Sequence, residues 1–189
     1  DGLPSPTLFE TETALAFWYF NREKCDIAVI ECGLGGADDA TNVLPAPLVC
    51  AFAHIDEDHK AILGNTIEEI AAVKAGIIKE GCEVVSVGQA DEALRVLEDK
   101  AKKCGAELFT AKPTRIRYGL KKQKFDFGKY KDLEIGMAGT VQPENATAAV
   151  CVADILDRKG FTISEKALRK GLALTNWNGR FTVPRERPY

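Results

Sequence analysis

The chain has 189 residues, of which 46% are apolar and 28% charged, and its formal net charge is −3. The length suits one domain, the composition is that of an ordinary globular protein, and the charge argues against a nucleic-acid surface. No apolar run approaches the roughly 18 residues that a membrane-spanning helix needs. The 6 cysteines form no Cys-x-x-Cys pair and show no zinc-ligand spacing, which predicts reduced thiols in a cytoplasmic protein.

The first predicted helix runs from Thr7 to about Phe20. Thr7 and Glu10 form a Thr-x-x-Glu capping box, with Pro6 directly ahead of it. The apolar side chains that follow supply a stripe along one face. From the residues alone, core packing is the simplest interpretation of Phe9, because aromatic side chains are usually buried for their large area.

A short apolar run follows from Ile27 to Ile30, without alternation of polar residues. That pattern is typical of a parallel strand buried on both faces. The run ends in Glu31 and a glycine-rich turn, Gly33 to Gly36. The turn does not match the dinucleotide pattern Gly-x-Gly-x-x-Gly, because position 38 is Asp38. The glycines are better interpreted as letting the backbone approach a ligand beside Glu31.

A second apolar run, Leu48 to Ile55, is followed by Asp58 and His59. Ligands of open α/β sheets bind at the carboxyl ends of the strands, so the two runs are expected to bring Glu31 and His59 to one edge. A carboxylate and one imidazole leave positions open for water and phosphate, which suits Mg²⁺, whereas structural zinc needs four protein ligands. An ordinary polar loop residue is the alternative interpretation of His59, and His54 is taken as structural.

A second capping box, formed by Thr66 and Glu69, opens a helix for which Gly81 is a natural end. At about 100° per residue, Lys74 falls near the middle of the apolar stripe of this helix. A lysine in that place either extends to solvent or is buried. If it is buried without a partner, its charged form is disfavoured and its pKa falls, which leaves a nucleophilic neutral amine.

In the second half of the chain the sequence predicts a further strand and helix, after which the apolar pattern changes. Between Thr114 and Ile135 apolar residues alternate with polar ones around the lysine-rich turn at Lys121 and Lys122, which predicts a solvated antiparallel hairpin at about 114–136. The remaining predicted elements are a strand at Glu83–Gly88, a helix at Asp91–Cys104, a strand at Glu107–Phe109, a helix at Pro143–Lys159 and a short helix from Ser164.

Several of these motifs occur in the same order in one known family. The segments concerned are Pro6–Glu10 with Thr13 and Ala14, Glu31–Gly36, Asp39–Asn42, Asp58–His59, Leu63–Thr66, Lys74–Lys79, Phe125–Phe127, Asn145–Ala146 and Trp177–Arg180. Over nearly its whole length the chain resembles the central domain of folylpolyglutamate synthase/dihydrofolate synthase, a member of the Mur ligase superfamily. The resemblance implies an α/β fold with a largely parallel sheet flanked by helices, similar to P-loop NTPases, plus a small antiparallel appendage.

The resemblance also implies roles for individual residues. The positions that border the pterin of the substrate in the family match Thr7, Phe9, Glu10, Asp39 and Ala40. The positions that bind Mg²⁺ match Glu31 and His59, and the catalytic positions match His59 and Lys74, of which the lysine is carbamylated in the family. The positions that hold ATP match Asn145 and Arg180; without the resemblance, the former is a helix-capping residue and the latter a solvated arginine.

The function implied is ATP-dependent amide ligation in folate biosynthesis and one-carbon metabolism. L-Glutamate is added through an acyl phosphate to dihydropteroate, to (poly)glutamylated folates, or to both. The chain contains no Gly-x-x-x-x-Gly-Lys-Ser/Thr motif. In the family this phosphate loop precedes the matching region and a carboxy-terminal domain follows it. Residues 1–189 are therefore predicted to be a partial central domain, inactive without those two partners, and binding neither nucleic acid nor membrane.

Three positions depart from the family pattern, and two rival interpretations stay open, of which the missing phosphate loop and Ala37 favour the non-catalytic one. Ala37 and Asp38 stand where the family has arginine and a bulky apolar residue, and Val141 stands where some relatives have histidine. A non-catalytic ligand-binding or scaffold module of the same fold is one rival. A cell-wall Mur peptide ligase, which would share the Mg²⁺ and lysine chemistry, is the other.

Overall fold

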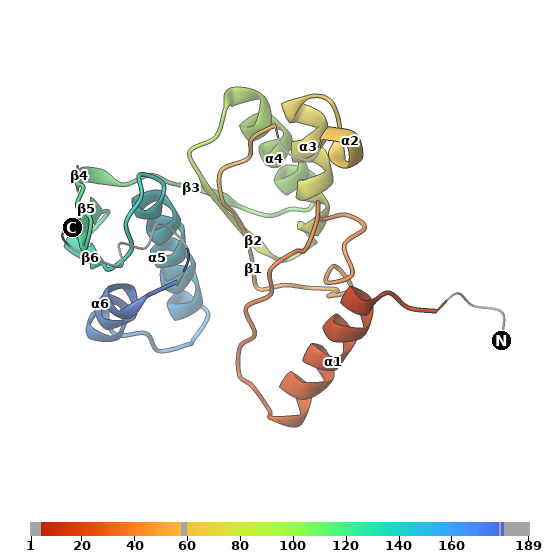
Figure 1. Ribbon diagram of the computed structural model, residues 1–189, viewed down its shortest axis with the longest axis horizontal. Coiled ribbons are helices and arrows are strands. Elements are labelled where there is room, and N and C mark those ends of the chain that lie inside the picture. The colour runs from red at the N-terminus through yellow and green to blue at the C-terminus, as the bar shows by residue number, and fades with distance from the viewer. Residues whose placement is uncertain (1–4, 58–59, 178, 180–189) are drawn as a thin grey trace, which may run out of the picture.

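The computed structural model describes residues 5–57, 60–177 and 179, and its centre is a three-stranded parallel sheet. The order is β1 (Val49–Phe52), β2 (Glu83–Val87) and β3 (Leu108–Ala111), with β2 in the middle (Figure 1). The four residues of β2 after Glu83 are all buried, because both faces of the sheet are covered. This explains why the β2 sequence is a nearly unbroken apolar run, as predicted for a parallel strand.

One face of the sheet is covered by α3 (Ile67–Lys74) and α4 (Asp91–Lys103), with the short α2 (Lys60–Leu63) beside them (Figure 1). The α4 residues Ala93, Leu97 and Ala101 are spaced four apart and are buried, so this helix is amphipathic as predicted.

The helix predicted from Thr66 to Gly81 is shorter than expected. It ends at Lys74, continues as a 3₁₀ turn η1 (Ala75–Ile77), and is extended at Ile78. A Cβ on Gly76 would lie 2.4 Å from the Ala37 side chain, so the backbone here turns against a neighbouring loop instead of continuing as a helix.

The opposite face of the sheet packs on α5 (Gln142–Arg158), which lies between the two sheets of the molecule (Figure 1). Ala148, Cys151 and Ile155 face the parallel sheet, whereas Val150 faces the second sheet. The final helix, α6 (Glu165–Leu174), packs on that second sheet through Leu168 and begins at the predicted Ser164 cap. Sequence prediction placed the start and end of α5 within one residue of those observed.

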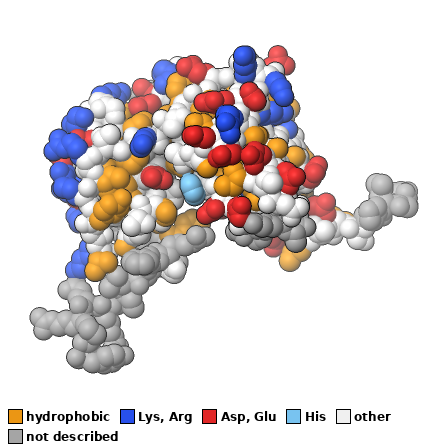
Figure 2. All heavy atoms as spheres, turned by 90° about the horizontal axis from the view of Figure 1, so that it is seen from above, with side chains coloured by type: hydrophobic (Ala, Val, Ile, Leu, Met, Phe, Trp, Pro, Cys, Tyr) orange, Lys and Arg blue, Asp and Glu red, His pale blue; other side chains and the backbone are white. Residues whose placement is uncertain are grey.

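The antiparallel appendage has three strands, not the two of the predicted hairpin. They are β4 (Thr114–Arg117), β5 (Gln123–Phe127) and β6 (Tyr130–Ile135), in that order. Gly128 has a φ of 52° in the second turn, where a glycine is favoured and which the sequence analysis missed. Figure 2 shows Lys and Arg side chains gathered over this end of the molecule, and ion pairs such as Lys122–Glu134 connect them across the strands.

Two predictions for the first third of the chain are wrong. Helix α1 (Leu8–Arg22) forms and is correctly capped, but it buries none of its residues, so its apolar stripe is not core. The run Ile27–Ile30 forms no strand, and the side chain of Val29 is 93% exposed. A strand needs hydrogen-bonding partners on a neighbouring strand, and within the described ranges no strand pairs with this run.

The six cysteines are free thiols, as predicted. The pKa of Cys50 is raised by burial and by the neighbouring Cys82 and Cys32, and burial also raises the pKa of Cys151. No helix in the part of the chain that the structure describes is long and apolar enough to cross a bilayer.

Candidate functional site

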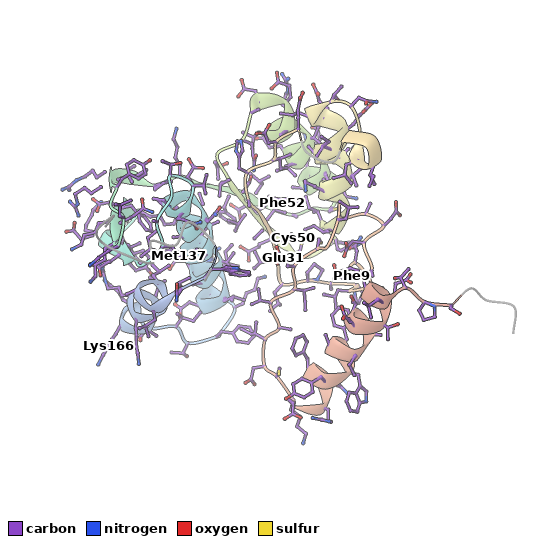
Figure 3. All side chains as sticks on the ribbon, viewed as in Figure 1. Phe9, Glu31, Cys50, Phe52, Met137 and Lys166 are labelled. Atoms are coloured by element: carbon purple, nitrogen blue, oxygen red, sulfur yellow. The ribbon has the colours of Figure 1, made fainter. Side chains whose placement is uncertain are left out.

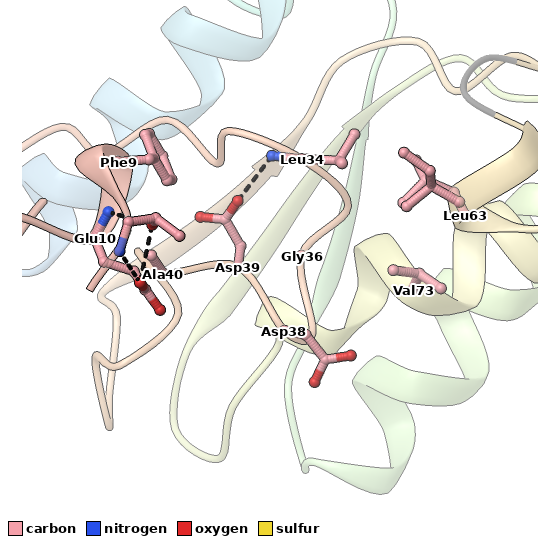
Figure 4. A pocket seen from close by; sticks show the side chains of 11 residues that line it. Phe9, Glu10, Leu34, Gly36, Asp38, Asp39, Ala40, Leu63 and Val73 are labelled. Atoms are coloured by element: carbon pink, nitrogen blue, oxygen red, sulfur yellow. Dashed lines mark hydrogen bonds between the residues drawn. The ribbon is translucent and has the colours of Figure 1, made fainter. Parts of the chain in front are cut away.

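A pocket of about 360 Å³ lies where the start of α1, the glycine-rich loop and α3 meet (Figure 4). All five residues that the sequence analysis assigned to the pterin line it: Thr7, Phe9, Glu10, Asp39 and Ala40. The glycine-rich turn, expected to approach a ligand, contributes Leu34 and Gly36, and the sequence analysis missed the remaining lining residues, which are Asp38, Ile62, Leu63 and Val73. The apolar ones range from the buried Leu63 to the exposed Ile62, and no local motif marks them as pocket residues.

The predicted capping box fixes the α1 side of the pocket. The Thr7 backbone N–H and hydroxyl donate to Glu10 Oε2 at 2.6 and 2.9 Å, while the Glu10 N–H donates to Thr7 Oγ1 at 3.2 Å. These bonds hold the pKa of Glu10 below its usual value. They also fix the first turn of the helix, which carries Phe9.

Phe9 packs against the glycine-rich loop and not in the core. Its side chain is 43% exposed, and a Cβ added to Gly33 would lie 2.6 Å from the end of its ring. Gly33 therefore allows the aromatic ring to lie directly on the backbone at the pocket wall, which is a ligand-facing position. The core interpretation of Phe9 is corrected accordingly.

Asp39 holds the loop in shape from within. Its Oδ2 accepts the Leu34 N–H at 2.7 Å, and its Oδ1 accepts the Thr41 N–H at 2.9 Å and the Thr41 hydroxyl at 2.5 Å. Partial burial alone would raise the pKa of Asp39, but the bonds from Thr41 and Leu34 outweigh burial and hold it below its ordinary value. The first and last parts of the loop are thereby tied through one carboxylate.

The loop lies directly on the end of α3. The Ala37 N–H donates to Val73 O at 2.9 Å, and a Cβ on Gly36 would lie 2.7 Å from Lys74 O. Lys74 is the last residue of α3. It is half-buried, which lies between the two alternatives predicted for it, a side chain extended to solvent and a buried one. Within the described residues its ammonium group makes no hydrogen bond or ion pair.

Of the two predicted metal ligands, Glu31 and His59, only Glu31 lies within the described residues. Glu31, labelled in Figure 3, lies on the extended segment that leads into the glycine-rich loop; it is exposed and has no protein partner in the described ranges. His59 lies outside the described residues. Among the residues searched, no group of three or more His, Cys, Asp or Glu side chains is arranged to hold a metal ion.

Of the two predicted ATP residues, only Asn145 lies within the described residues. Asn145 is exposed in the first turn of α5, where its N–H donates to Val141 O at 3.1 Å, but no side chain caps this helix. The capping role considered for Asn145 is therefore wrong. Arg180 lies outside the described residues.

Gln89 is a residue that the sequence analysis missed. Its Oε1 accepts the Ile55 N–H at 2.8 Å, and its Nε2 donates to Ala53 O at 2.8 Å and to Ser86 Oγ at 3.1 Å. It thus ties the segment that follows β1, and leads toward His59, to the end of β2. A glutamine directly after a buried strand was the only signal in the sequence.

Comparison with known proteins shows which family shares this sequence and fold. Residues 6–153 match the model of the Mur ligase middle domain. A curated relative, "Dihydrofolate synthase/folylpolyglutamate synthase" of Bacillus subtilis, is 38% identical over 97% of the chain and 45% of its own length. A folylpolyglutamate synthase of Arabidopsis thaliana is 38% identical over 97% of the chain and 32% of its own length.

Solved structures agree with the sequence matches. An FPGS–AMPPCP–folate complex superposes with a TM-score of 0.87 at 33% identity, covering 92% of this chain and 44% of that one. Folylpolyglutamate synthase from Thermotoga maritima gives a TM-score of 0.81 at 38% identity, over 93% and 41% of the two chains. The chain thus spans less than half the length of these relatives. Its fold and its sequence lead to one assignment: the chain belongs to the Mur ligase middle-domain family.

Proposed function

We propose that this chain is part of an ATP-dependent ligase that adds L-glutamate to dihydropteroate, to (poly)glutamylated folates, or to both. The observation that carries the proposal is the pocket, because the five residues expected to border a pterin line a single cavity. The names of the relatives that match over 97% of the chain support the same substrate class.

The pocket suits a flat heterocycle with a polar edge. Phe9 offers a ring face on one side, and Leu34, Leu63 and Val73 offer apolar contacts. Aromatic and apolar walls with few polar groups are typical of small-molecule sites. The carboxylate of Asp38 has no protein partner among the described residues and is available to accept N–H donors of a ligand.

Charge sets the orientation of the substrate in this proposal. Glu10, Asp38 and Asp39 line the pocket, so the negatively charged glutamate end of a folate is repelled from it and the pterin end is accepted.

In the reaction proposed, a substrate carboxylate oxygen forms a bond to the γ-phosphorus of ATP and ADP leaves. The amine of glutamate then attacks the acyl carbon, phosphate leaves, and the attacking nitrogen loses a proton. Positioning and charge neutralisation dominate such phosphoryl transfer. Asn145 and Arg180 are proposed to hold the nucleotide.

Glu31 and His59 are proposed to hold Mg²⁺. The free and exposed carboxylate of Glu31 fits a hydrated hard cation, which accepts one or two carboxylates and retains several waters. When bound, this ion would neutralise phosphate charge.

Lys74 is proposed to be carbamylated. The ammonium group would first release one proton, and the neutral amine would then bond to the carbon of CO₂ and release a second proton to solvent. The cation is thereby replaced by an anion that has two acceptor oxygens. Its half-buried position without a protein partner agrees with such a modification.

We place the enzyme in the cytoplasm, where its six thiols stay reduced. We expect the 189-residue chain alone to be inactive without the remaining domains.

The test is a product assay with the full-length protein, ATP, Mg²⁺ and L-glutamate. Dihydropteroate, tetrahydrofolate and a nucleotide-linked cell-wall peptide are offered separately, and products are identified by mass spectrometry. A pterin product that gains one glutamate residue is expected. Reaction with the peptide alone identifies a cell-wall ligase, and pterin binding without any product identifies a non-catalytic module; either result overturns the proposal.

A further inference from the structure

The side chain of Asn42 bridges the pocket loop and η1, the 3₁₀ turn that follows α3. Its Nδ2 donates to Ala37 O at 2.8 Å within the loop and to Gly76 O at 3.3 Å, which lies 34 residues away in sequence. The Asn42 backbone N–H is used separately, donating to Asp39 O at 2.8 Å. One amide group therefore joins two segments that carry different parts of the proposed site.

These two segments meet with little space between them. Ala37 N–H donates to Val73 O, and a Cβ on Gly76 would lie 2.4 Å from the Ala37 Cβ. The backbones thus approach as closely as glycine allows, and Asn42 is half-buried beside the junction. Lys74 directly follows Val73 and lies two positions before Gly76, so contacts on both sides of it hold its backbone in place.

The chemistry of the junction selects the amide. Two carbonyl oxygens face Nδ2, and an asparagine supplies two N–H donors without a charge. An aspartate of the same shape would place acceptor oxygens against two acceptors, and alanine would leave both bonds unmade.

We propose that Asn42 is a positioning residue that sets the distance between the pterin pocket and Lys74. This inference rests on the proposed function, which assigns those two groups to the same reaction. Asp39 joins parts of the loop to each other, whereas Asn42 fixes that loop against η1, which directly follows Lys74. Small displacements of reacting groups reduce turnover strongly even when binding persists, because productive geometry is lost.

The experiment uses the full-length protein with Asn42→Ala, Asn42→Asp and, as a matched control, Asn21→Asp at an exposed position of α1. Binding of dihydropteroate is measured by fluorescence titration, which gives both Kd and stoichiometry, and glutamate addition gives kcat. Asn42→Ala is expected to keep full stoichiometry and a Kd within about threefold of wild type, while kcat falls about tenfold or more. Asn42→Asp is expected to lower kcat further, and Asn21→Asp to leave both unchanged.

Retention of kcat within twofold in Asn42→Ala overturns the inference, and so does a parallel loss of binding stoichiometry and kcat, which indicates a structural role only. If Asn42→Ala does not fold, Gly76→Ala provides the second measurement, because it separates the same segments without touching Asn42. Its kcat is then expected to fall with binding retained. Glutamate addition by the wild-type protein is measured in the same series, so failure of the proposed function is seen separately.

Discussion

At the scale of single residues, the ionised carboxylate of Asp39 accepts the hydrogen bonds that hold the pocket loop together. Its pKa is held below the ordinary value of 3.8 by hydrogen bonds that the folded loop supplies. A carboxyl with a lowered folded-state pKa contributes stability above its unfolded pKa, and this contribution is lost as pH falls through the folded value. The loop is therefore expected to loosen in acid.

We predict that Asp39→Asn lowers the free energy of unfolding at pH 7, because asparagine has one acceptor oxygen and one NH₂ group and cannot accept both the Leu34 N–H and the Thr41 donors, which bond to different oxygens in the wild type. Leaving such donors unpaired costs about 1–3 kcal/mol. The difference from wild type is expected to shrink as pH is lowered from 7 toward 3 in urea-unfolding measurements. Asp99→Asn, at an exposed position of α4, serves as the control. A difference that stays constant with pH would contradict the role given to the ionised Asp39.

Lys74 carries the second prediction at this scale. In the full-length protein, Lys74→Ala is expected to reduce kcat at least a hundredfold, and short-chain carboxylates such as formate or acetate are expected to restore part of it by occupying the space of the carbamate. Lys103→Ala, which removes an exposed lysine of α4, is the matched control. A Lys74→Ala enzyme with a normal kcat removes the functional assignment, and turnover that no carboxylate improves removes the carbamate.

At the scale of elements, the glycine-rich loop is shaped by what each glycine touches. A Cβ on Gly33 would meet the end of the Phe9 ring, which can rotate away, whereas one on Gly36 would meet the backbone oxygens of Val73 and Lys74 at 2.9 and 2.7 Å. The first substitution is thus a change to the pocket wall, and the second is a change to the packing of the loop.

We predict that Gly33→Ala changes the free energy of unfolding by no more than about 0.5 kcal/mol. It should nevertheless weaken pterin binding, because Phe9 is displaced. Gly36→Ala is expected to destabilise by about 1–3 kcal/mol, as overpacking against backbone does. Chemical denaturation and fluorescence titration distinguish the two effects. Equal losses of stability in both variants would show that Phe9 is not free to move.

The elements that sequence predicted well are those specified by local signals. Both capping residues, Thr7 and Ser164, accept bonds from the N–H groups expected of them, and the apolar run of β2 is a buried central strand. The Thr66 cap also forms, but Glu69 bonds back to the Asn65 N–H, so the box is displaced by one residue. Such features depend only on residues a few positions apart.

The predictions that failed depend on partners far away in sequence. Ile27–Ile30 has the composition of a buried strand, yet no described strand pairs with it. Phe9 has the character of a core residue, and its place at the pocket wall depends on Gly33, 24 positions later. Neither the pairing of a strand nor the cover of a helix face is encoded by local pattern. The family resemblance, not periodicity, is what indicated the pterin residues.

At the scale of the whole molecule, α5 connects two sheets of different character. On one side of α5 lies the parallel sheet, whose edge strand β1 follows the pocket loop in sequence. On its other side lies the charged antiparallel sheet (Figures 1 and 2). The candidate pterin residues gather at one end, in the pocket between α1 and α3. Asn145 belongs to the first turn of α5, so the same helix supplies a candidate ATP residue and much of the second core.

The central claim is amide ligation through an acyl phosphate, and oxygen transfer tests it most directly. The full-length protein is supplied with ATP, Mg²⁺, L-glutamate and dihydropteroate labelled with ¹⁸O in its carboxylate. One labelled oxygen is expected to appear in the inorganic phosphate released for each glutamate added, because the carboxylate oxygen that attacks phosphorus leaves with it. Glutamate addition with unlabelled phosphate, or labelled substrate that gains no glutamate at all, would contradict the account.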